Sequence, residues 1–471
     1  MFLREAQCTR LRPMHPRSRL LPALATAAAL LAVPSAAAAA DYVPGEVVVR
    51  YHASAEGKQK AVQRQAGVGR ARTFAPRTQV LKIRDGESVA DTVRELRARP
   101  EVATAVPNQI ARLARFIPAD RGNTGTPQGW QSLQWNFLEG AGVSAPDAWQ
   151  NLIDVGRPGG RGAVVAVLDT GVAYANRGRR FRRSPDFWYG DFVRGYDFVD
   201  RDRDPSDENG HGTHVASTIG ERTNNQLGVT GLAYGAKIMP IRVLDEDGAG
   251  DSVDITAAIR YAVRRGADVI NLSFEFDDGF RQVRSSEIPD VLAALRYAYR
   301  QGVLVVAAAG NQARRAIAYP ARSPYTMAVG ATTEHACLAD YSNIGRGLDI
   351  VAPGGGADDT NDPACPPGAP AGRDIIQMTY PWASGYDAAR ARSTYRRFGL
   401  PGGFVGTSMA SPHVAATAAL VVSSQVIGPA PSPKALMLHL QATATDTGVA
   451  GFDSRYGAGR LNAAAATAPP G

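Results

Sequence analysis

The chain has 471 residues, of which 44% are hydrophobic and 20% are charged, a composition that predicts two or three globular units rather than a disordered chain. The formal net charge is +8, but residues 1–40 contribute +4 and residues 41–119 contribute +6, so the remainder is slightly acidic. Because the excess of basic over acidic residues is confined to the N-terminal quarter, the sequence does not favour a nucleic-acid partner.

The first forty residues have the organisation of an export signal. Arginines precede an apolar run over residues 20–33, and the small residues 35–40 offer a cleavage site. This apolar run is too short and too rich in alanine to form a stable transmembrane helix. The alternative is an amphipathic anchor that is retained in the mature protein. Both Met1 and Met14 remain possible starts. We therefore expect a secreted, soluble protein with no membrane partner.

Residues 41–119 are predicted to form a small α+β unit. Residues 46–51 and 79–83 are β-branched runs that predict strands. Residues 88–97 predict a helix because their apolar positions share one face. The following stretch, residues 115–129, is rich in Gly, Thr and Pro, and we interpret it as a linker and processing region.

Residues 120–471 alternate apolar runs with helical stretches. That alternation predicts parallel strands covered by helices on both faces, with active residues at the carboxyl ends of the strands. No internal repeat and no appended C-terminal domain is expected. The apolar runs are residues 164–168, 267–272 and 303–309, and the helical stretches are residues 253–265 and 288–301.

Four polar residues lie in separate segments that are rich in small residues, and together they provide the parts of a nucleophilic site. A serine hydroxyl needs a base and a group that orients the base. Ser408 follows a Gly turn at the start of a helix, and His211 lies between two glycines at the head of another. Asp169 and Asn311 each follow an apolar run, where they can orient the imidazole and donate to an oxyanion.

Each of these residues also has a plainer interpretation. An Asp after a buried strand is often a helix cap, and Asp169 taken by itself is better explained in that way. His211 and His214 are spaced like metal ligands, but no Glu or Cys partner has a fitting spacing. We expect His214 and His413 to be packed structural residues and Ser411 to lie inside the helix that follows Ser408.

The segments Asp169-Thr-Gly, Asn209-Gly-His-Gly-Thr-His and Gly406-Thr-Ser-Met-Ala-Ser-Pro-His resemble, in this order, the signatures of the subtilisin-like serine peptidases (peptidase family S8). The resemblance spans roughly residues 130–465. It implies a three-layer α/β fold with a mainly parallel central sheet, and a catalytic triad with Asn311 as the oxyanion donor. It also implies that residues 41–119 are an inhibitor-type propeptide, with residues 120–471 as the catalytic domain.

The resemblance also implies a substrate cleft, in which this chain departs from the family. Many members have Ser-Leu-Gly-Gly where this chain has Ser-Phe-Glu-Phe, so the side chain preferred before the cleaved bond (P1) is in doubt. An edge strand at residues 248–250 should pair with substrate, while the insertions 177–183 and 354–403 are expected to be a solvated loop and a cleft rim. The implied cleft residues are Gly248, Ala249, Gly250, Ser273, Phe274, Glu275, Ala308 and Gly310.

Two further features concern stability. Cys337 and Cys365 are the cysteines left after export, and an even pair in an oxidising compartment favours a disulfide, with two free thiols as the alternative. By the resemblance, Asp186 and Asn225 match positions that hold a stabilising calcium in many relatives, although ordinary turns explain them equally well. No cofactor is expected for catalysis.

The sequence thus predicts a secreted serine endopeptidase that cleaves protein or peptide substrates, matures by autoprocessing and is a monomer. Its own propeptide is the expected inhibitor and folding aid. One alternative is a catalytically silent relative that only binds. Another is a serine hydrolase of the α/β-hydrolase fold, but its G-x-S-x-G elbow and Ser-Asp-His order are missing here.

Overall fold

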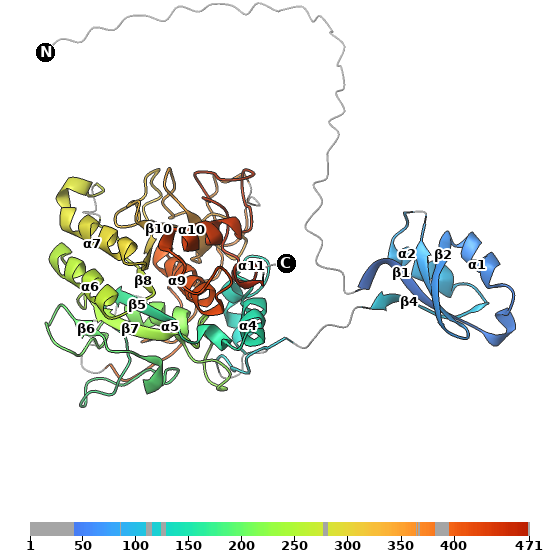
Figure 1. The fold of residues 1–471 in the computed structure, drawn as a ribbon, viewed down its shortest axis with the longest axis horizontal. Helices are drawn as coiled ribbons and strands as arrows, with labels where there is room; N and C mark the ends of the chain where they lie inside the picture. The colour runs from blue at the N-terminus through green and yellow to red at the C-terminus, as the bar shows by residue number, and fades with distance from the viewer. Residues whose placement is uncertain are drawn as a thin grey trace, which may run out of the picture. The chain divides into compact units, whose positions relative to one another are not determined.

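The computed structural model describes residues 42–84, 86–109, 115–123, 129–276, 281–363, 365, 368–381 and 395–469. The chain divides into two compact units between residues 113 and 114 (Figure 1). The predicted export signal lies outside the described residues. In the described part, no helix has the length and apolar character that a bilayer span requires.

The smaller unit is a four-stranded antiparallel sheet with two helices. The strand order is β2-β3-β1-β4, so β1 is a central strand that pairs with both β3 and β4. Helix α2 begins after Ser88, whose hydroxyl accepts a hydrogen bond from the amide of Asp91 at 3.1 Å. The predicted helix and two strands are present, but the other elements were not predicted. The elements are β1 (Tyr42–Tyr51), α1 (Gln59–Gln65), β2 (Val68–Ala75), β3 (Thr78–Ile83), α2 (Val89–Arg97) and β4 (Val102–Gln109).

The larger unit contains a seven-stranded parallel sheet in the order β11-β10-β9-β8-β5-β7-β6. Almost every residue of its central strands is buried, which explains why they read as continuous apolar runs. The strands are β5 (Val164–Asp169), β6 (Tyr196–Asp197), β7 (Lys237–Arg242), β8 (Val269–Leu272), β9 (Leu304–Ala308), β10 (Thr326–Thr332) and β11 (Ile350–Pro353).

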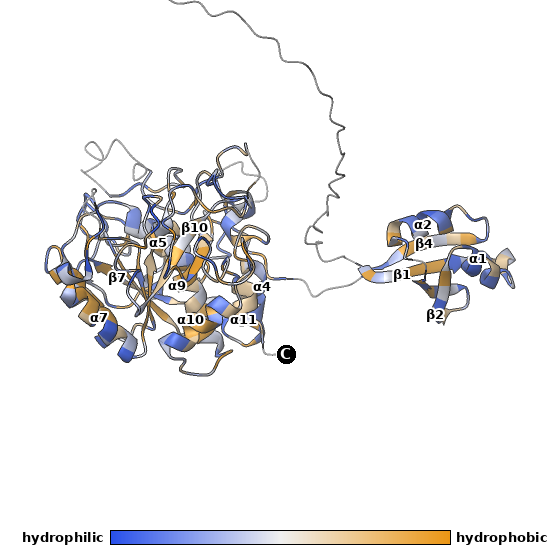
Figure 2. Ribbon diagram, turned by 90° about the horizontal axis from the view of Figure 1, so that it is seen from above, coloured by the Kyte–Doolittle hydropathy of each residue, from blue (hydrophilic) through white to orange (hydrophobic). Residues whose placement is uncertain are grey.

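Helices cover both faces of this sheet, which gives the expected three layers. One core joins the sheet to α4, α5, α9, α10 and α11, and a second joins it to α6 and α7. Figure 2 shows hydrophobic and hydrophilic sides on α7, as its position over the sheet requires. The helices are α3 (Trp130–Leu133), α4 (Ala145–Asp154), α5 (His211–Gly220), α6 (Ser252–Arg264), α7 (Pro289–Arg300), α9 (Thr407–Ser424), α10 (Pro433–Ala442) and α11 (Ala463–Thr467).

The segment before α3 belongs to the larger unit, although the prediction assigned its first residues to the propeptide. The ring of Phe116 packs edge-on against Trp149, with 6.3 Å between centroids, and its amide donates to the Gln150 side chain at 3.2 Å. Arg115 forms ion pairs with Glu139 and Asp147. The larger unit is therefore already ordered at Arg115.

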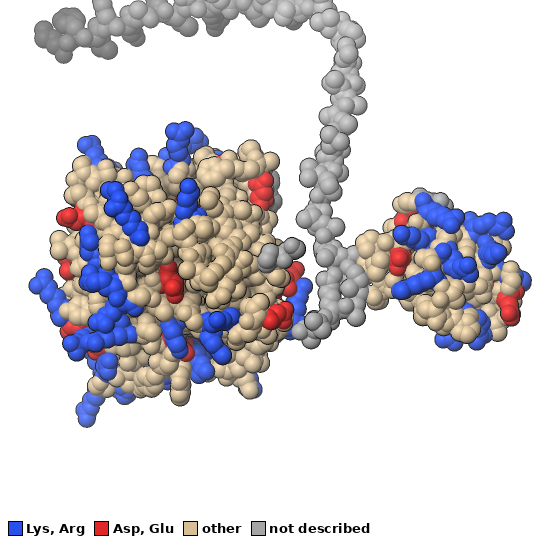
Figure 3. All heavy atoms as spheres, viewed as in Figure 1, with Lys and Arg blue, Asp and Glu red and all other residues tan. Residues whose placement is uncertain are grey.

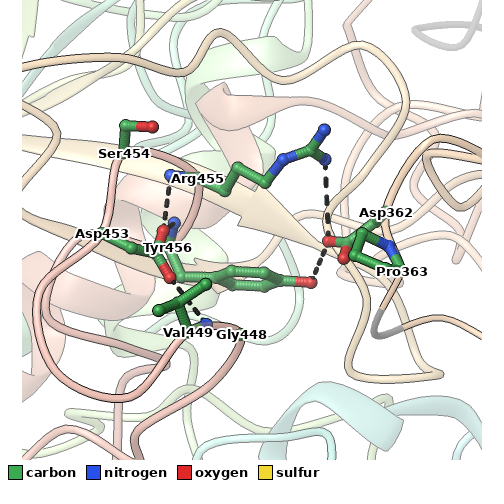
Figure 4. A pocket seen from close by; sticks show the side chains of 8 residues that line it. All are labelled: Asp362, Pro363, Gly448, Val449, Asp453, Ser454, Arg455 and Tyr456. Atoms are coloured by element: carbon green, nitrogen blue, oxygen red, sulfur yellow. Dashed lines mark hydrogen bonds and ion pairs between the residues drawn. The ribbon is translucent and has the colours of Figure 1, made fainter.

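The predicted disulfide between Cys337 and Cys365 is present. It ties the segment after β10 to a loop that is also held by the C-terminal region (Figure 4). Tyr456 donates to Asp362 at 2.5 Å, and the guanidinium of Arg455 lies 3.0 Å from Asp359. Asp362 and Arg455 line the adjoining cavity of about 480 Å³, and the third charged side chain there, Asp453, accepts from backbone amides. The charged groups of this cavity therefore support the loop.

Figure 3 shows Lys and Arg side chains spread over the visible face of both units, with fewer acidic side chains between them. The slightly acidic total from residue 120 onward therefore does not give this face an acidic surface.

Candidate active site

Asp169 and His211 form a hydrogen-bonded pair at the carboxyl end of β5. Asp169 is fully buried, and its Oδ1 accepts from the backbone amide of Thr170 and from His211 Nδ1, each at 2.7 Å. The His211 side chain retains 27% exposure, so the imidazole remains accessible. This pair holds one edge of the imidazole and leaves the ring able to exchange a proton with a bound molecule.

Two opposing effects set the proton affinity of His211. Burial disfavours the charged imidazole, but the Coulombic attraction of Asp169 and its hydrogen bond outweigh that effect, so the pKa of His211 lies above its ordinary value. The pair therefore stabilises the imidazolium that forms when the ring accepts a proton.

The backbone around His211 leaves no room for a side chain at Gly212. A Cβ atom there would lie 2.1 Å from the carbonyl oxygen of Gly171 and 3.0 Å from the Cβ of Asp169. This close approach brings the first turn of α5 against the end of β5. The glycine after the histidine is thus explained by packing against the aspartate segment.

Asp207 holds the loop that precedes His211, a role that the sequence did not reveal. Its carboxylate is fully buried and accepts hydrogen bonds from the amides of Asn209, Gly210 and Thr213, each at 2.9 Å. It also accepts from the hydroxyls of Thr170 and Thr213 at 2.9 and 2.5 Å. These donors connect the loop before the histidine to the residue after Asp169. The only sequence signal was an acidic residue shortly before the Asn-Gly-His-Gly motif.

Ser408 lies in the first turn of α9 and is connected to the end of β8. Its Oγ donates to the carbonyl of Ser273 at 3.0 Å, and the Ser273 hydroxyl donates to the carbonyl of Ser408 at 2.8 Å. Asn271 donates to the Ser273 hydroxyl at 2.9 Å and accepts from Ser411 at 2.8 Å. Among the described residues, no hydrogen bond joins His211 Nε2 to the Ser408 hydroxyl, so the serine rests against β8.

Asn311 follows β9 and is oriented by the residue before the serine. Its Oδ1 accepts from the amide and the hydroxyl of Thr407, at 2.8 and 2.9 Å. A Cβ on Gly406 would lie 3.4 Å from Asn311 Nδ2. Since its oxygen is engaged by Thr407, the side chain presents its NH₂ group as the available donor beside the serine turn.

The cleft residues implied by the resemblance lie at or after the ends of the strands that carry these groups. Residues 248–250 differ from the expectation, because they are not in a strand. Ala308 ends β9, and residues 273–275 continue from β8. Residues 248–250 form a turn after β7, in which the amide of Asp245 donates to the carbonyl of Ala249 at 2.8 Å. Residues 248–250 therefore do not form the predicted edge strand. The carbonyl of Ala249 is instead used within the local turn.

The predicted solvated loop at residues 177–183 is exposed at residues 177–180 but packed at its end, around Phe181. The ring of Phe181 stacks on Tyr395, with 5.3 Å between centroids, and their segments exchange backbone hydrogen bonds. Arg180 covers both rings and lies 2.7 Å from Glu208. The fully buried Tyr380 donates to the carbonyl of Asp207 at 3.1 Å. The two insertions therefore form one packed structure that buttresses the loop before His211.

His214 and His413 are buried, as expected of structural residues. His214 Nε2 contacts the carbonyl of Ile375 at 3.0 Å, and its ring stacks on Phe404 at 4.0 Å. Burial lowers the pKa of His214 to about 3 and that of His413 to about 4. Both rings are therefore neutral near pH 7. Ser411 lies inside α9, also as expected.

The loop suggested for calcium brings together more acidic groups than the sequence indicated. Asn225 donates to Asp186 at 2.6 Å, and the amides of Asn224 and Asn225 both donate to Asp120 at 2.8 Å. Burial raises the pKa of Asp186 to about 8 and also raises the pKa values of Asp120 and Glu221. In the described part of the chain, no set of three or more His, Cys, Asp or Glu side chains has the geometry of a metal site.

The comparisons with known proteins agree with this geometry. The model of the subtilase family, peptidase S8, matches residues 160–459. The chain belongs to the subtilase family. A second model, the fervidolysin N-terminal prodomain, matches residues 30–108, which include the described part of the smaller unit except its last residue, Gln109. Together these matches show a subtilisin-like serine endopeptidase that carries an N-terminal prodomain.

Individual relatives cover most of this subtilase. It is 34% identical over 386 residues to a thermophilic serine proteinase of Bacillus sp. (strain AK1), which covers 81% of this chain and 79% of the relative. It is 36% identical over 337 residues to subtilisin BL of Lederbergia lenta, or 72% of this chain and 99% of the relative. A solved protease structure from Pseudoalteromonas arctica has a TM-score of 0.55 and 29% identity, covering 71% of this chain and 96% of the other.

Proposed function

We propose that Ser408, His211 and Asp169 are the catalytic triad of this endopeptidase. Ser408 Oγ attacks the peptide carbonyl carbon while His211 takes the hydroxyl proton, and the resulting imidazolium is stabilised by Asp169. His211 then returns the proton to the leaving nitrogen, and the C–N bond breaks to give an acyl-enzyme. Water hydrolyses this ester by the same proton transfers. Because Ser408 rests on Ser273, its hydroxyl must rotate toward the imidazole when substrate binds.

The observation that carries this proposal is the 2.7 Å hydrogen bond between Asp169 and the accessible His211. Asn311 supports it as the oxyanion donor, because Thr407 orients its amide beside the serine turn. These contacts also argue against a catalytically inactive relative that only binds. Such a protein would not need a base and an oriented hydrogen-bond donor beside the same serine.

The test compares Ser408→Ala with a control, Ser424→Ala, at the far end of the same helix. We expect Ser408→Ala to abolish casein hydrolysis and labelling by a serine-directed phosphonate, whereas Ser424→Ala keeps both. Normal casein hydrolysis by Ser408→Ala would refute the triad assignment.

We propose further that the prodomain inhibits and assists folding until Ser408 removes it, and that the protein is secreted as a monomer. The match to a prodomain model supports the first part. Ser408→Ala should then accumulate uncut precursor, and the wild-type N-terminus should lie between about residues 110 and 128. Residues 41–115 added in trans should restore folding of a chain that begins near Asn123, and should inhibit it until they are digested. An active enzyme that still begins at Asp41 would contradict this account and favour a permanent N-terminal domain.

We also propose a structural calcium ion held by Asp186 and Asn225, with Asp120 beside them. The fit rests on the unpartnered Oδ2 of Asp186, which is buried among the described residues, and on carboxylate and amide oxygens, which suit a hard cation. In a Ser408→Ala background, calcium should raise the Tm and magnesium should not. Adding Asp186→Asn should abolish the calcium effect. A Tm that does not depend on calcium in the Ser408→Ala protein with Asp186 intact would refute the site.

A further inference from the structure

Arginines from two distant segments come together where the two insertions meet. The amide of Tyr395 donates to the carbonyl of Arg180, and the amide of Arg182 donates to the carbonyl of Tyr395, each at 2.9 Å. Residues 177 and 181 also exchange backbone hydrogen bonds, which close the loop between them. We call the surface around this junction the basic surface. Its members are Arg177, Arg179, Arg180, Arg182, Arg396 and Arg397.

Most of the charge on the basic surface is not neutralised by the protein. Arg177 lies 3.3 Å from Asp204, and Arg180 lies 2.7 Å from Glu208. Among the described residues, the other four guanidinium groups form no ion pair. Three of these four side chains are exposed, namely Arg179, Arg396 and Arg397. Since like charges on one surface repel each other, an anion that binds there is attracted by all of them.

The residue type and its packing indicate the kind of anion that fits. All six cations are arginines, whose planar guanidinium can bind a carboxylate through two parallel hydrogen bonds. The guanidinium of Arg180 lies over the rings of Phe181 and Tyr395, 5.0 and 5.3 Å from their centroids. These rings stack on each other, so part of the surface is held in place before a ligand binds. The basic surface therefore suits a ligand that carries several carboxylates.

The basic surface lies beside the loop that leads to His211. Glu208, the partner of Arg180, is three residues before His211 in the chain, and three residues span at most about 11 Å. The first insertion follows β5 at its carboxyl end, where Asp169 lies, and the second leads into α9, which carries Ser408. A peptide that is bound at the proposed triad can therefore reach this surface with residues a short distance from the cleaved bond.

We propose that the basic surface is an exosite, a second binding site that holds an acidic segment of protein substrates outside the cleft. The inference rests on the catalytic assignment proposed above, because the position of His211 relates this surface to the cleft. Opposite charge attracts an acidic segment over a distance and raises its local concentration. The exosite does not touch the reacting atoms, so it lowers KM and leaves kcat nearly unchanged. The endopeptidase should thus favour proteins with stretches rich in Asp and Glu.

The experiment compares two internally quenched peptides that share a sequence which the enzyme cleaves in casein. At both ends this sequence is followed by a flexible linker and a run of either Glu or Gln. Wild-type enzyme is compared with a basic-surface variant and with a control variant, each of which replaces three exposed arginines by Gln. Active enzyme is counted by phosphonate labelling, so that poor folding is not mistaken for weaker binding.

The two variants carry the same change in charge at opposite ends of the sheet. The basic-surface variant combines Arg179→Gln, Arg396→Gln and Arg397→Gln. The control combines Arg157→Gln, Arg161→Gln and Arg264→Gln, at exposed positions that precede β5 and β8 and so lie toward the amino ends of these strands.

At low salt, we expect wild-type and control enzymes to have a KM for the Glu-flanked peptide at least about tenfold below that for the Gln-flanked peptide, with similar kcat. The difference should nearly vanish at about 1 M salt, where charges are screened beyond about 3 Å. The basic-surface variant should lose most of the difference, while its kcat/KM for the Gln-flanked peptide changes less than about threefold. Equal cleavage of both peptides by wild-type enzyme at low salt would overturn the proposal, and so would a difference that the basic-surface variant keeps in full.

Failure of the catalytic assignment gives a different result. In that case, Ser408→Ala would still cleave the Gln-flanked peptide. If Ser408→Ala cleaves neither peptide and the wild-type enzyme cleaves both equally, only the exosite is refuted. Wild-type enzyme without a preference that binds vesicles of anionic lipid, together with a basic-surface variant that does not, would assign the surface to a membrane and would also overturn the proposal.

Discussion

Replacing Asp207 tests whether a buried carboxylate holds His211, the proposed general base, in place. Its two oxygens accept from five donors, three of them amides of the loop and first turn around His211. A buried donor left without an acceptor costs about 1–3 kcal/mol, but water entering the vacated space would satisfy several of the five. We therefore expect Asp207→Ala to lower the free energy of unfolding by about 3–5 kcal/mol. Asp207→Asn, which keeps one acceptor oxygen, should lower it by about 2 kcal/mol.

The measurement is urea unfolding in a Ser408→Ala background, which prevents self-digestion. Tryptophan fluorescence reports only the larger unit, because every Trp lies outside residues 41–113. In enzyme that retains Ser408, Asp207→Ala should lower kcat at least about tenfold. A displaced His211 would no longer be placed to accept the Ser408 proton when substrate is bound. Glu208→Gln is the matched control, because its exposed partner Arg180 predicts a loss below about 1 kcal/mol. Equal stability and equal kcat for Asp207→Ala and Glu208→Gln would refute this role of Asp207.

Three further predictions follow from the site and the disulfide. Replacing Cys337 and Cys365 together by Ser should cost about 3–4 kcal/mol under the chain-entropy model, for a sequence separation of 28 residues; an unchanged urea midpoint would contradict it. The pH profile of kcat/KM should fall on the acid side with an apparent pKa above about 6.5, because protonated His211 cannot accept the serine proton; an acid limb well below that value would contradict the raised pKa. Asn311→Ala should lower kcat by about 10²–10³-fold with little change in KM, and a change confined to KM would exclude the oxyanion role.

The sequence was sufficient to predict the fold and to bring the main site residues together. Buried parallel strands appear as continuous apolar runs, and Asp169 and Asn311 directly follow two such runs. The carboxyl ends of parallel strands meet at one edge of a sheet. The motifs that contain Asp169 and Asn311 could therefore be placed near one another, although the sequence gives no distance between them. The same reasoning did not predict β2, β4 and α1 of the smaller unit, because their apolar residues are fewer and less regular.

The supporting contacts of the site could not be predicted, because they join segments that are distant in the chain. Asp120 meets the loop at Asn225, more than one hundred residues away, through backbone amides that any residue type supplies. The charges of the Arg-rich insertion correctly suggested that residues 177–180 are exposed, but they gave no sign that the end of the loop is packed. Only the three-dimensional structure shows that Tyr395 stacks on Phe181 and that Arg180 covers both rings.

The proposed nucleophile and the proposed base are held by separate sets of contacts. Asn271 and Ser273 of the β8 segment hold Ser408, whereas Asp207, supported by Tyr380, holds the loop before His211. Among the described residues, no hydrogen bond connects the Ser408 hydroxyl to the imidazole, so substrate binding must complete this last contact. A substitution in the packed part of the insertions should therefore act through the position of the base and change kcat and its pH dependence. A substitution of Asn271 or Ser273 should instead act through the position of Ser408.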